Sequence, residues 1–261
     1  MIILILSILI LLNIFLLYLL NRKKIKKLFF KSKINEVDIS KLHKIFQTEK
    51  ISLNLYSPKK ETIIKSFCIP PNSQIPGLTS EYEAWILASL SKVSKNIFEF
   101  GTCSGKTTFL LALNSSENSK IFSITLKSDQ AKNIVKKKDD NKISYRNILN
   151  ESIYDKFFFS GSDVEKKIKV IFQNSLEFEE MQYLNQFDLI FIDGGHTYSV
   201  IKNDSEKSFK MLNSNGIILW HDYVPGKESA KNVVKYIHEI SKNKKIFHLK
   251  NTSLCFYKNY S

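Results

Sequence analysis

The chain has 261 residues, of which 43% are hydrophobic and 25% charged, so a packed core is possible and wholesale disorder is excluded. Three widely spaced cysteines, Cys68, Cys103 and Cys255, form no CxxC pair, which excludes a disulfide framework and a cysteine-based zinc site. The formal net charge of +14 would suit a nucleic-acid partner. However, seven basic residues lie between Arg22 and Lys33, and most others are lysines scattered along the chain, so no nucleic-acid partner is expected.

The first twenty residues are almost entirely Ile, Leu and Phe. About twenty apolar residues is the length that a helix needs to cross a bilayer. A cleaved signal peptide would carry its positive charge before the apolar run, whereas here the basic residues follow it. Residues 1–20 are therefore predicted to be a single transmembrane anchor, with the rest of the chain in the cytoplasm by the positive-inside rule. The basic flank would add contacts with anionic lipid.

Residues 21–77 are predicted to form a basic juxtamembrane segment and linker. Repeated breakers interrupt this region, namely Pro58, Pro70, Pro71, Pro76 and Gly77. The catalytic domain is predicted to occupy residues 78–261.

From residue 80 onward, helical and strand patterns alternate, which predicts an α/β fold with a Rossmann-like, doubly wound, mostly parallel sheet. Ligands of such sheets bind at the carboxyl ends of the strands. The expected elements are a helix at 80–90, a strand at 96–100, a helix at 106–113, strands at 121–126, 169–172 and 187–192, a helix at 200–212, a strand at 216–220, a helix at 226–241 and a closing strand or hairpin at 247–257.

The segment IFEFGTCSGKTTFLLA carries a glycine turn between a strand and a helix. Gly101 and Gly105 allow close backbone approach to a ligand, and the helix start offers free N–H groups. The letters GKT suggest a phosphate-binding loop, but that motif needs four residues between its first glycine and the GK pair. Only three separate Gly101 from Gly105, so a nucleotide hydrolase is disfavoured. A tight turn without any ligand stays open.

A second group of polar residues follows two apolar runs. Asp193 comes directly after the strand at 187–192, His196 lies in the turn beyond it, and His221 and Asp222 follow the strand at 216–220. All four should therefore meet at one edge of the sheet. Asp193 and Asp222 could hold Mg²⁺, which would lower the pKa of a substrate hydroxyl. Alternatively, His196 or His221 acts as a general base, or His221 only caps its strand.

Both segments resemble motifs of the bacterial methyltransferase-24 family of class I S-adenosylmethionine-dependent methyltransferases. The first is similar to the family's E-x-G-T-x-x-G-x-T turn, and the second to its I-D-G-x-H-x-Y turn with a later H-D-Y. The resemblance spans roughly 78–257 and implies S-adenosylmethionine as cofactor and a small-molecule or glycan-like acceptor methylated on oxygen. It also implies catalytic roles for Asp193, His196, His221 and Asp222. The cofactor contacts that it implies are Glu99, Gly101, Thr102, Ser104, Gly105, Thr107, Thr125, Asn174, Ser175 and Asp193.

The sequence departs from the family's pattern at three places. Thr125 stands where an acid usually accepts both ribose hydroxyls, and Asn174 stands before Ser175 where Asp is usual. Losing a hydrogen bond to a charged acceptor costs ~1.5–3 kcal/mol. Sugar-modifying relatives commonly use two adjacent acids where this chain has His221 and Asp222. A non-catalytic relative, retained as a binding or scaffold protein, is therefore the alternative function.

Overall fold

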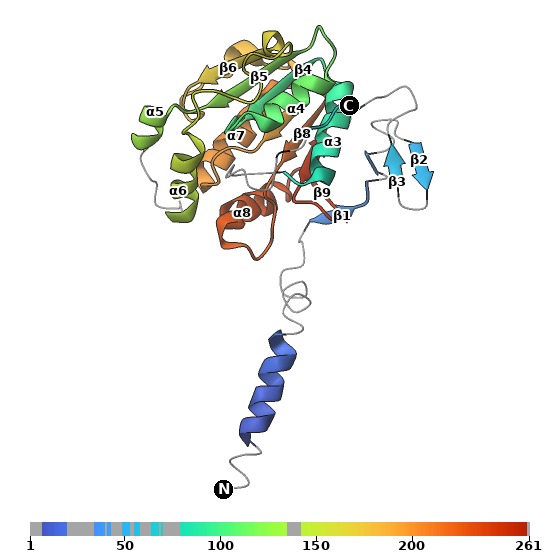
Figure 1. Cartoon of the computed structure of the whole chain (residues 1–261), viewed down its shortest axis with the longest axis vertical. Coiled ribbons are helices and arrows are strands. Elements are labelled where there is room, and N and C mark those ends of the chain that lie inside the picture. Colours follow the sequence, from blue (N-terminus) through green and yellow to red (C-terminus); the bar gives the residue numbers. More distant parts are fainter. Residues whose placement is uncertain are drawn as a thin grey trace.

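The structure is a computed structural model of the whole chain (Figure 1). The residues that it describes are 7–19, 34–39, 41–42, 49–52, 55–57, 64–67, 69, 79–134 and 142–259. The basic segment from Arg22 to Lys33 and much of the predicted linker lie outside them.

The centre of the fold is an eight-stranded sheet in the order β1-β9-β10-β8-β7-β4-β5-β6. The five strands from β8 to β6 run parallel to one another, and β10 is antiparallel to both β8 and β9. The expected doubly wound, mostly parallel α/β sheet is confirmed. Its strands are β1 (Asn35–Val37), β4 (Asn96–Phe100), β5 (Lys120–Thr125), β6 (Ile168–Phe172), β7 (Phe187–Ile192), β8 (Leu212–Trp220), β9 (Phe247–Leu249) and β10 (Cys255–Lys258).

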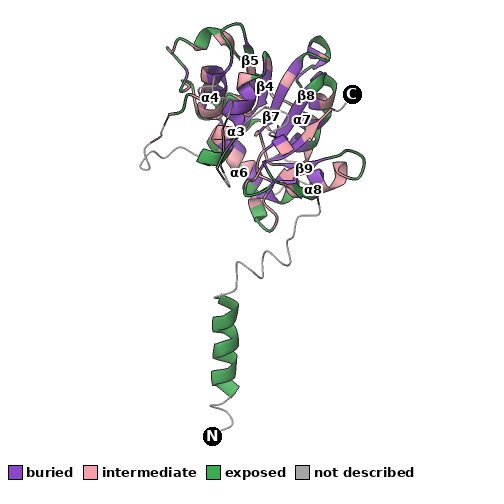
Figure 2. Cartoon of the chain, turned by 90° about the vertical axis from the view of Figure 1, so that its right-hand side faces the viewer, coloured by how far each residue is buried: buried purple, intermediate pink, exposed green. Residues whose placement is uncertain are grey.

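Helices cover both faces of this sheet because successive strand residues point to opposite sides. On one face Ile97 packs with helices α3 and α4, and on the other its neighbour Phe98 belongs to the core that α7 and α8 complete. Figure 2 shows the resulting buried layers along the strands. The helices are α3 (Glu81–Lys92), α4 (Lys106–Asn114), α5 (Ser128–Lys132), α6 (Lys142–Glu151), α7 (Tyr198–Met211) and α8 (Lys231–Ile240), and the short 3-10 helices are Glu165–Lys167, Met181–Tyr183 and Glu228–Ala230.

Helix α3 begins with a reciprocal capping box. The Ser80 hydroxyl accepts a hydrogen bond from the Glu83 N–H, and the Glu83 carboxylate accepts one from the Ser80 N–H at 3.0 Å. These two bonds satisfy backbone donors that a helix start leaves open, which is why the helix begins at Glu81. The cap also fixes where the Glu83 side chain lies, a point that matters for the site below.

Residues 7–19 form an apolar helix whose side chains are exposed, separate from the sheet in Figures 1 and 2. Within the described residues, no helix has both the length and the apolar character needed to cross a membrane. The prediction of a single-pass membrane protein with a membrane-spanning anchor at 1–20 is therefore wrong, and association with a membrane is not supported.

Residues of the predicted linker form three short strands, which take part in two strand pairings. Strand β1 pairs in parallel with β9 and extends the main sheet, with Asn35 opposite Phe247. Strands β2 (Glu49–Ser52) and β3 (Leu55–Ser57) form a separate two-stranded antiparallel sheet. The linker prediction did not anticipate any of these strands. The division of the chain at residue 78 stays a prediction.

Candidate functional site

Strands β4, β7 and β8 are neighbours, and the residues after their carboxyl ends continue the sheet's hydrogen bonding. The Asp193 N–H donates to the Phe100 carbonyl at 2.9 Å, and the His221 N–H donates to the Ile192 carbonyl at 3.0 Å. Because these strands are parallel, the polar residues that follow them are carried to one edge. This places Asp193 beside both the glycine turn and His221.

The glycine turn requires both of its glycines. Gly101 has φ of +99°, and a Cβ there would lie 2.7 Å from the Gly194 Cα and overlap the Asp193 carbonyl. Gly105 has φ of +78°, and its Cβ would lie 2.7 Å from the Phe157 Cβ. Such positive φ values are costly for residues with a side chain. The turn therefore packs tightly against the β7 end on one side and the segment at 157–159 on the other.

Glu99 lies beneath the turn and is fully buried. Its Oε2 accepts hydrogen bonds from the Ser123 hydroxyl at 2.6 Å and from the Thr108 hydroxyl. Its Oε1 has no hydrogen-bond partner within the described part of the chain. Burial raises the pKa of Glu99 to about 8, against the effect of the two hydroxyls, with a smaller contribution from Asp193. Glu99 thus supports the turn from the inside as a largely protonated carboxyl at neutral pH.

A cavity opens above the turn, with an empty volume of about 580 Å³. Five of the residues predicted to contact a cofactor line it: Gly101, Thr125, Asn174, Ser175 and Asp193. The others, Glu99, Thr102, Ser104, Gly105 and Thr107, are not among the lining residues.

Three of the described residues that line the cavity carry carboxyl groups, and none of them is a lysine, arginine or histidine. They are Asp193, Asp204 on α7 and Glu151 on α6. Burial raises the pKa of Asp204 to about 7 against hydrogen bonds from Ser175 and Asn203. Burial also raises the pKa of Glu151 to about 7, with His196 opposing and Asp193 and Asp222 adding to the shift. The sequence reasoning missed Asp204 and Glu151, because no motif singles out either residue.

The thiol of Cys103, in the middle of the glycine turn, also lines the cavity. Burial, with Glu151 next in size, raises its pKa to about 12. At neutral pH this group is therefore an uncharged thiol and a poor nucleophile.

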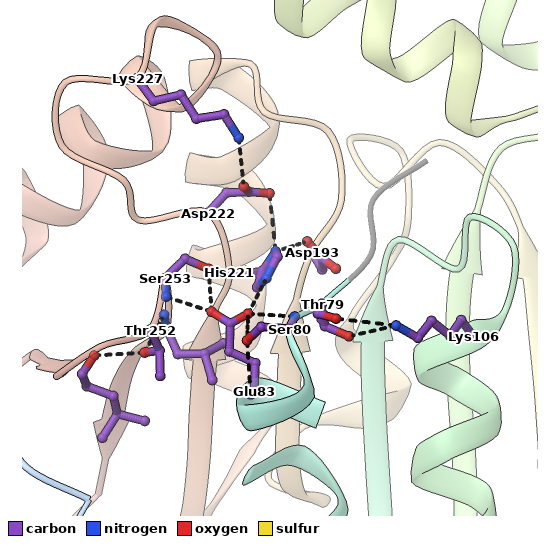
Figure 3. Close-up of polar contacts among 12 residues, drawn as sticks. Thr79, Ser80, Glu83, Lys106, Asp193, His221, Asp222, Lys227, Thr252 and Ser253 are labelled. Carbon is purple, nitrogen blue, oxygen red and sulfur yellow. Dashed lines mark hydrogen bonds and ion pairs between the residues drawn. The ribbon is translucent and has the colours of Figure 1, made fainter. Parts of the chain in front are cut away.

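Beside the cavity, two imidazoles and two carboxylates form a compact cluster, part of which Figure 3 shows. His196 Nε2 lies 3.0 Å from Asp222 Oδ2. His221 Nδ1 lies 2.9 Å from Asp193 Oδ1 and 3.2 Å from Asp222 Oδ2. Lys227 reaches Asp222 from outside at 3.9 Å. All four residues predicted to be catalytic are thus brought together.

The cluster's charges are mutually stabilising. Burial opposes the charged form of both imidazoles, but Asp222 raises the pKa of His196, and Asp193 leads the groups that raise the pKa of His221 well above its usual value. Burial likewise opposes ionisation of Asp222, but the two imidazoles hold its pKa well below the usual range. Asp222 also has φ of +59°, a strained backbone conformation of the kind found at functional sites.

A further acid, Glu83, reaches the cluster from α3. Its Oε2 lies 3.6 Å from His221 Nε2, longer than a hydrogen bond but within the range of an ion pair. Burial opposes ionisation of Glu83, but the His221 imidazole and hydrogen bonds from Ser253 and Ser80 hold its pKa well below the ordinary value. The Ser-x-x-Glu spacing at Ser80 was the available signal for this residue, but it indicates only a helix cap.

The residues present suit a divalent cation. Asp193, His196 and Asp222 each offer a ligand atom, and these atoms lie within 4.8 Å of one another. Two carboxylates with one imidazole suit a transition metal such as Mn²⁺ better than Mg²⁺, which prefers oxygen ligands alone. The predicted pair of Asp193 and Asp222 would thus be joined by His196. The metal assignment stays a prediction.

Lys106, the lysine of the GKT sequence, points away from the cavity. Lys106 Nζ donates to the Thr79 carbonyl at 3.3 Å, at the start of α3, as Figure 3 shows, and Lys106 does not line the cavity. This arrangement agrees with the loop spacing, which already disfavoured a phosphate-binding loop.

The sheet order and the glycine turn after β4 are those of a class I methyltransferase fold. Residues 98–223 match the model of the methyltransferase-24 family, which is described as a methyltransferase domain. This match confirms the recognition made from the two motifs, and residues 98–223 form a methyltransferase domain.

Solved structures share this fold. The SAH-bound methyltransferase PaMTH1 of Podospora anserina is 14% identical with a TM-score of 0.50, and the similarity covers 70% of this chain and 80% of that one. A Corynebacterium glutamicum protein is 10% identical with a TM-score of 0.50, covering 71% and 83%. An O-methyltransferase from Bacillus cereus in complex with SAH is 15% identical with a TM-score of 0.48, covering 70% and 84%. No curated protein sequence matches the chain significantly.

Proposed function

We propose that this protein transfers a methyl group from S-adenosylmethionine to a hydroxyl oxygen of a small or glycan-like acceptor. The observation that carries the proposal is the position of Asp193. Its side chain lines the cavity and also lies 2.9 Å from His221 in the adjoining cluster. A cofactor in the cavity would therefore present its methyl group next to groups that can take up a proton.

The cavity suits the cofactor's charge and its polar groups. When bound, S-adenosylmethionine supplies an electrophilic methyl group on a positively charged sulfur. Asp193 and the partly ionised carboxyl groups of Asp204 and Glu151 line the same cavity and favour a cationic ligand. Thr125 and Asn174, at the positions that the family resemblance assigns to ribose and adenine, offer a hydroxyl and an amide to the cofactor.

His196 is the better candidate for the general base. Both ring nitrogens of His221 face carboxylates, Nδ1 toward Asp193 and Asp222 and Nε2 toward Glu83. His196 contacts Asp222 through Nε2, whereas no described residue forms a hydrogen bond or an ion pair with its Nδ1. Asp222 would hold this ring in place and stabilise its protonated form, as the acid of a catalytic triad does.

The reaction balances without any further reactant. As the acceptor oxygen forms its bond to the methyl carbon, the carbon–sulfur bond breaks and its electron pair stays on sulfur. The acceptor's proton passes to the His196 imidazole. A divalent cation held by Asp193, His196 and Asp222 would instead acidify the hydroxyl directly, and it would then occupy the base's position. The two routes therefore predict opposite effects of adding Mn²⁺.

The deciding measurement is calorimetric titration of S-adenosylmethionine into the full chain, with Gly101→Arg as the binding-deficient control. We expect micromolar binding to the wild type and none to the variant. Transfer of a radiolabelled methyl group to a panel of small polyols and monosaccharides, with and without Mn²⁺ or a chelator, then tests the acceptor class and the base. No binding to folded wild type at millimolar cofactor would favour the non-catalytic scaffold.

A further inference from the structure

The Glu83 carboxylate joins two distant parts of the chain. Its Oε2 accepts hydrogen bonds from the Ser80 N–H at 3.0 Å and the Ser80 hydroxyl at 2.7 Å. Its Oε1 accepts hydrogen bonds from the Ser253 N–H at 2.6 Å and the Ser253 hydroxyl at 2.8 Å. Four donors on two oxygens fix the carboxylate in one orientation. The side chain is only 7% exposed, so water competes little for these bonds.

These contacts exceed what a helix cap requires. A capping box uses the bond between the N3 side chain and the Ser80 N–H, which occupies one oxygen. The second oxygen is held by Ser253, which follows Ser80 by more than 170 positions and precedes β10. Figure 3 shows Glu83 between Ser253 and His221. The capping role therefore leaves both the Ser253 bonds and the approach to His221 unexplained.

The His221 ring lies between Glu83 and the two aspartates. Its Nε2 edge faces Glu83 Oε2 at 3.6 Å and makes no hydrogen bond with the described residues. Its Nδ1 edge faces Asp193 at 2.9 Å and Asp222 at 3.2 Å. Turning the ring over would point carbon at both aspartates: Asp193 Oδ1 would lose its 2.9 Å contact, and Asp222 would keep only its contacts with His196 and Lys227. A fixed carboxylate on the opposite edge disfavours that turn.

We propose that Glu83 is a positioning residue of the active site: it holds the His221 ring so that Nδ1 faces both Asp193 and Asp222. Glu83 does not line the cavity, so it acts through His221 and not on a ligand. Fixing a ring through its second nitrogen is the way in which carboxylates orient ligating and catalytic histidines. The inference rests on the proposed function, because it takes these three residues as the catalytic cluster.

The test is long-range proton–nitrogen NMR of histidine rings in the full chain, with His221 assigned from a His221→Gln variant. The wild type should give one set of His221 ring signals, with a proton on Nδ1 and, in the charged ring, a second proton on Nε2. Glu83→Gln removes the charge but keeps the helix cap, because Gln also serves at this capping position. The Nδ1 proton signal should then lose at least half its intensity, or split, as the ring samples two orientations.

Glu180→Gln is the matched control, because Glu180 is another buried carboxylate, paired with Lys210 at 2.7 Å away from the cluster. The control should leave the His221 signal unchanged. An unchanged signal in folded Glu83→Gln would overturn the proposal, as would an equal loss in the control. If Glu83→Gln does not fold, the Ser253→Ala variant is measured instead. A partial loss of the His221 Nδ1 proton signal then supports the positioning role, and an unchanged signal overturns it.

Cofactor titration of the same proteins separates this inference from the proposed function. Glu83→Gln should bind S-adenosylmethionine within about twofold of the wild type, since Glu83 lies outside the cavity. A wild type that binds no cofactor would overturn the proposed function, while the NMR comparison would still decide whether Glu83 orients His221. A tenfold loss of cofactor affinity in Glu83→Gln alone would contradict the positioning role.

Discussion

The segments that follow β4 and β8 contribute to the site in different ways. After β4 the chain uses backbone: Gly101 and Gly105 adopt positive φ, and the buried Glu99 carboxyl supports the turn with a raised pKa. After β8 it uses charged side chains, and His221 and Asp222 stabilise each other's ionised forms. An added side chain should therefore disrupt the glycine turn after β4. Loss of a charge should instead disrupt the cluster after β8.

The largest effect is expected from adding atoms at the β4 end. Gly101→Arg combines a strained φ with overlap of the Asp193 carbonyl, and it should abolish detectable cofactor binding and destabilise the domain by about 2–4 kcal/mol. Gly161→Ala is the matched control, because Gly161 has φ of +78° but open space around its Cβ. Calorimetry and thermal melts of both variants check this. Normal cofactor affinity in Gly101→Arg would show that the glycine turn is not part of the cofactor site.

A smaller effect is expected from removing charge at the two acidic residues, and it should differ between them. Asp193 lines the cavity and Asp222 does not. Asp193→Asn should weaken S-adenosylmethionine binding about tenfold or more, the loss typical of a charged hydrogen-bond partner. Asp222→Asn should change the dissociation constant by no more than about twofold and act on methyl transfer instead. Equal losses of affinity would show that cavity and cluster are one binding site.

The smallest effect concerns pH. Since the folded-state pKa of Glu99 is about 8, above its unfolded value of 4.5, its contribution to stability is complete below pH 4.5 and is lost as the pH rises to about 8. The melting temperature of Glu99→Gln should therefore fall less than that of the wild type between pH 6 and 9. Glu180→Gln is the control, because Lys210 lowers the pKa of Glu180 and places its pH dependence at acidic values. Parallel curves for Glu99→Gln and wild type would indicate that Glu99 is already ionised.

The strands of the central sheet could be predicted because burial on both faces leaves continuous apolar runs. The predicted bounds of β4 and β7 agree with the structure at both ends. Strand β1 could not be predicted, since its three residues NEV carry no such pattern and depend on pairing with β9, more than 200 positions later. Helix α6, with the sequence KISYRNILNE, was also not predicted.

Only the site residues that belong to the two sequence motifs could be predicted. Asp193, His196, His221 and Asp222 follow apolar strands closely, so the sheet topology brings them together. Glu83, Glu151 and Asp204 come from three separate helices, and tertiary packing alone directs them to the site. The anchor predicted at residues 1–20 was wrong: its apolar composition suggested a span, but no helix of the described residues has the length and apolar character needed to cross a membrane.

The bond between Glu83 and Ser253 also bears on how the protein is made. Helix α3 leaves the ribosome long before the residues preceding β10, so a growing chain holds Glu83 with its second oxygen unpaired for most of synthesis. Contacts of such large sequence separation form late in folding, because closing the long loop costs entropy before it is rewarded. The contacts that hold both oxygens of Glu83 are therefore complete only after the residues preceding β10 have left the ribosome.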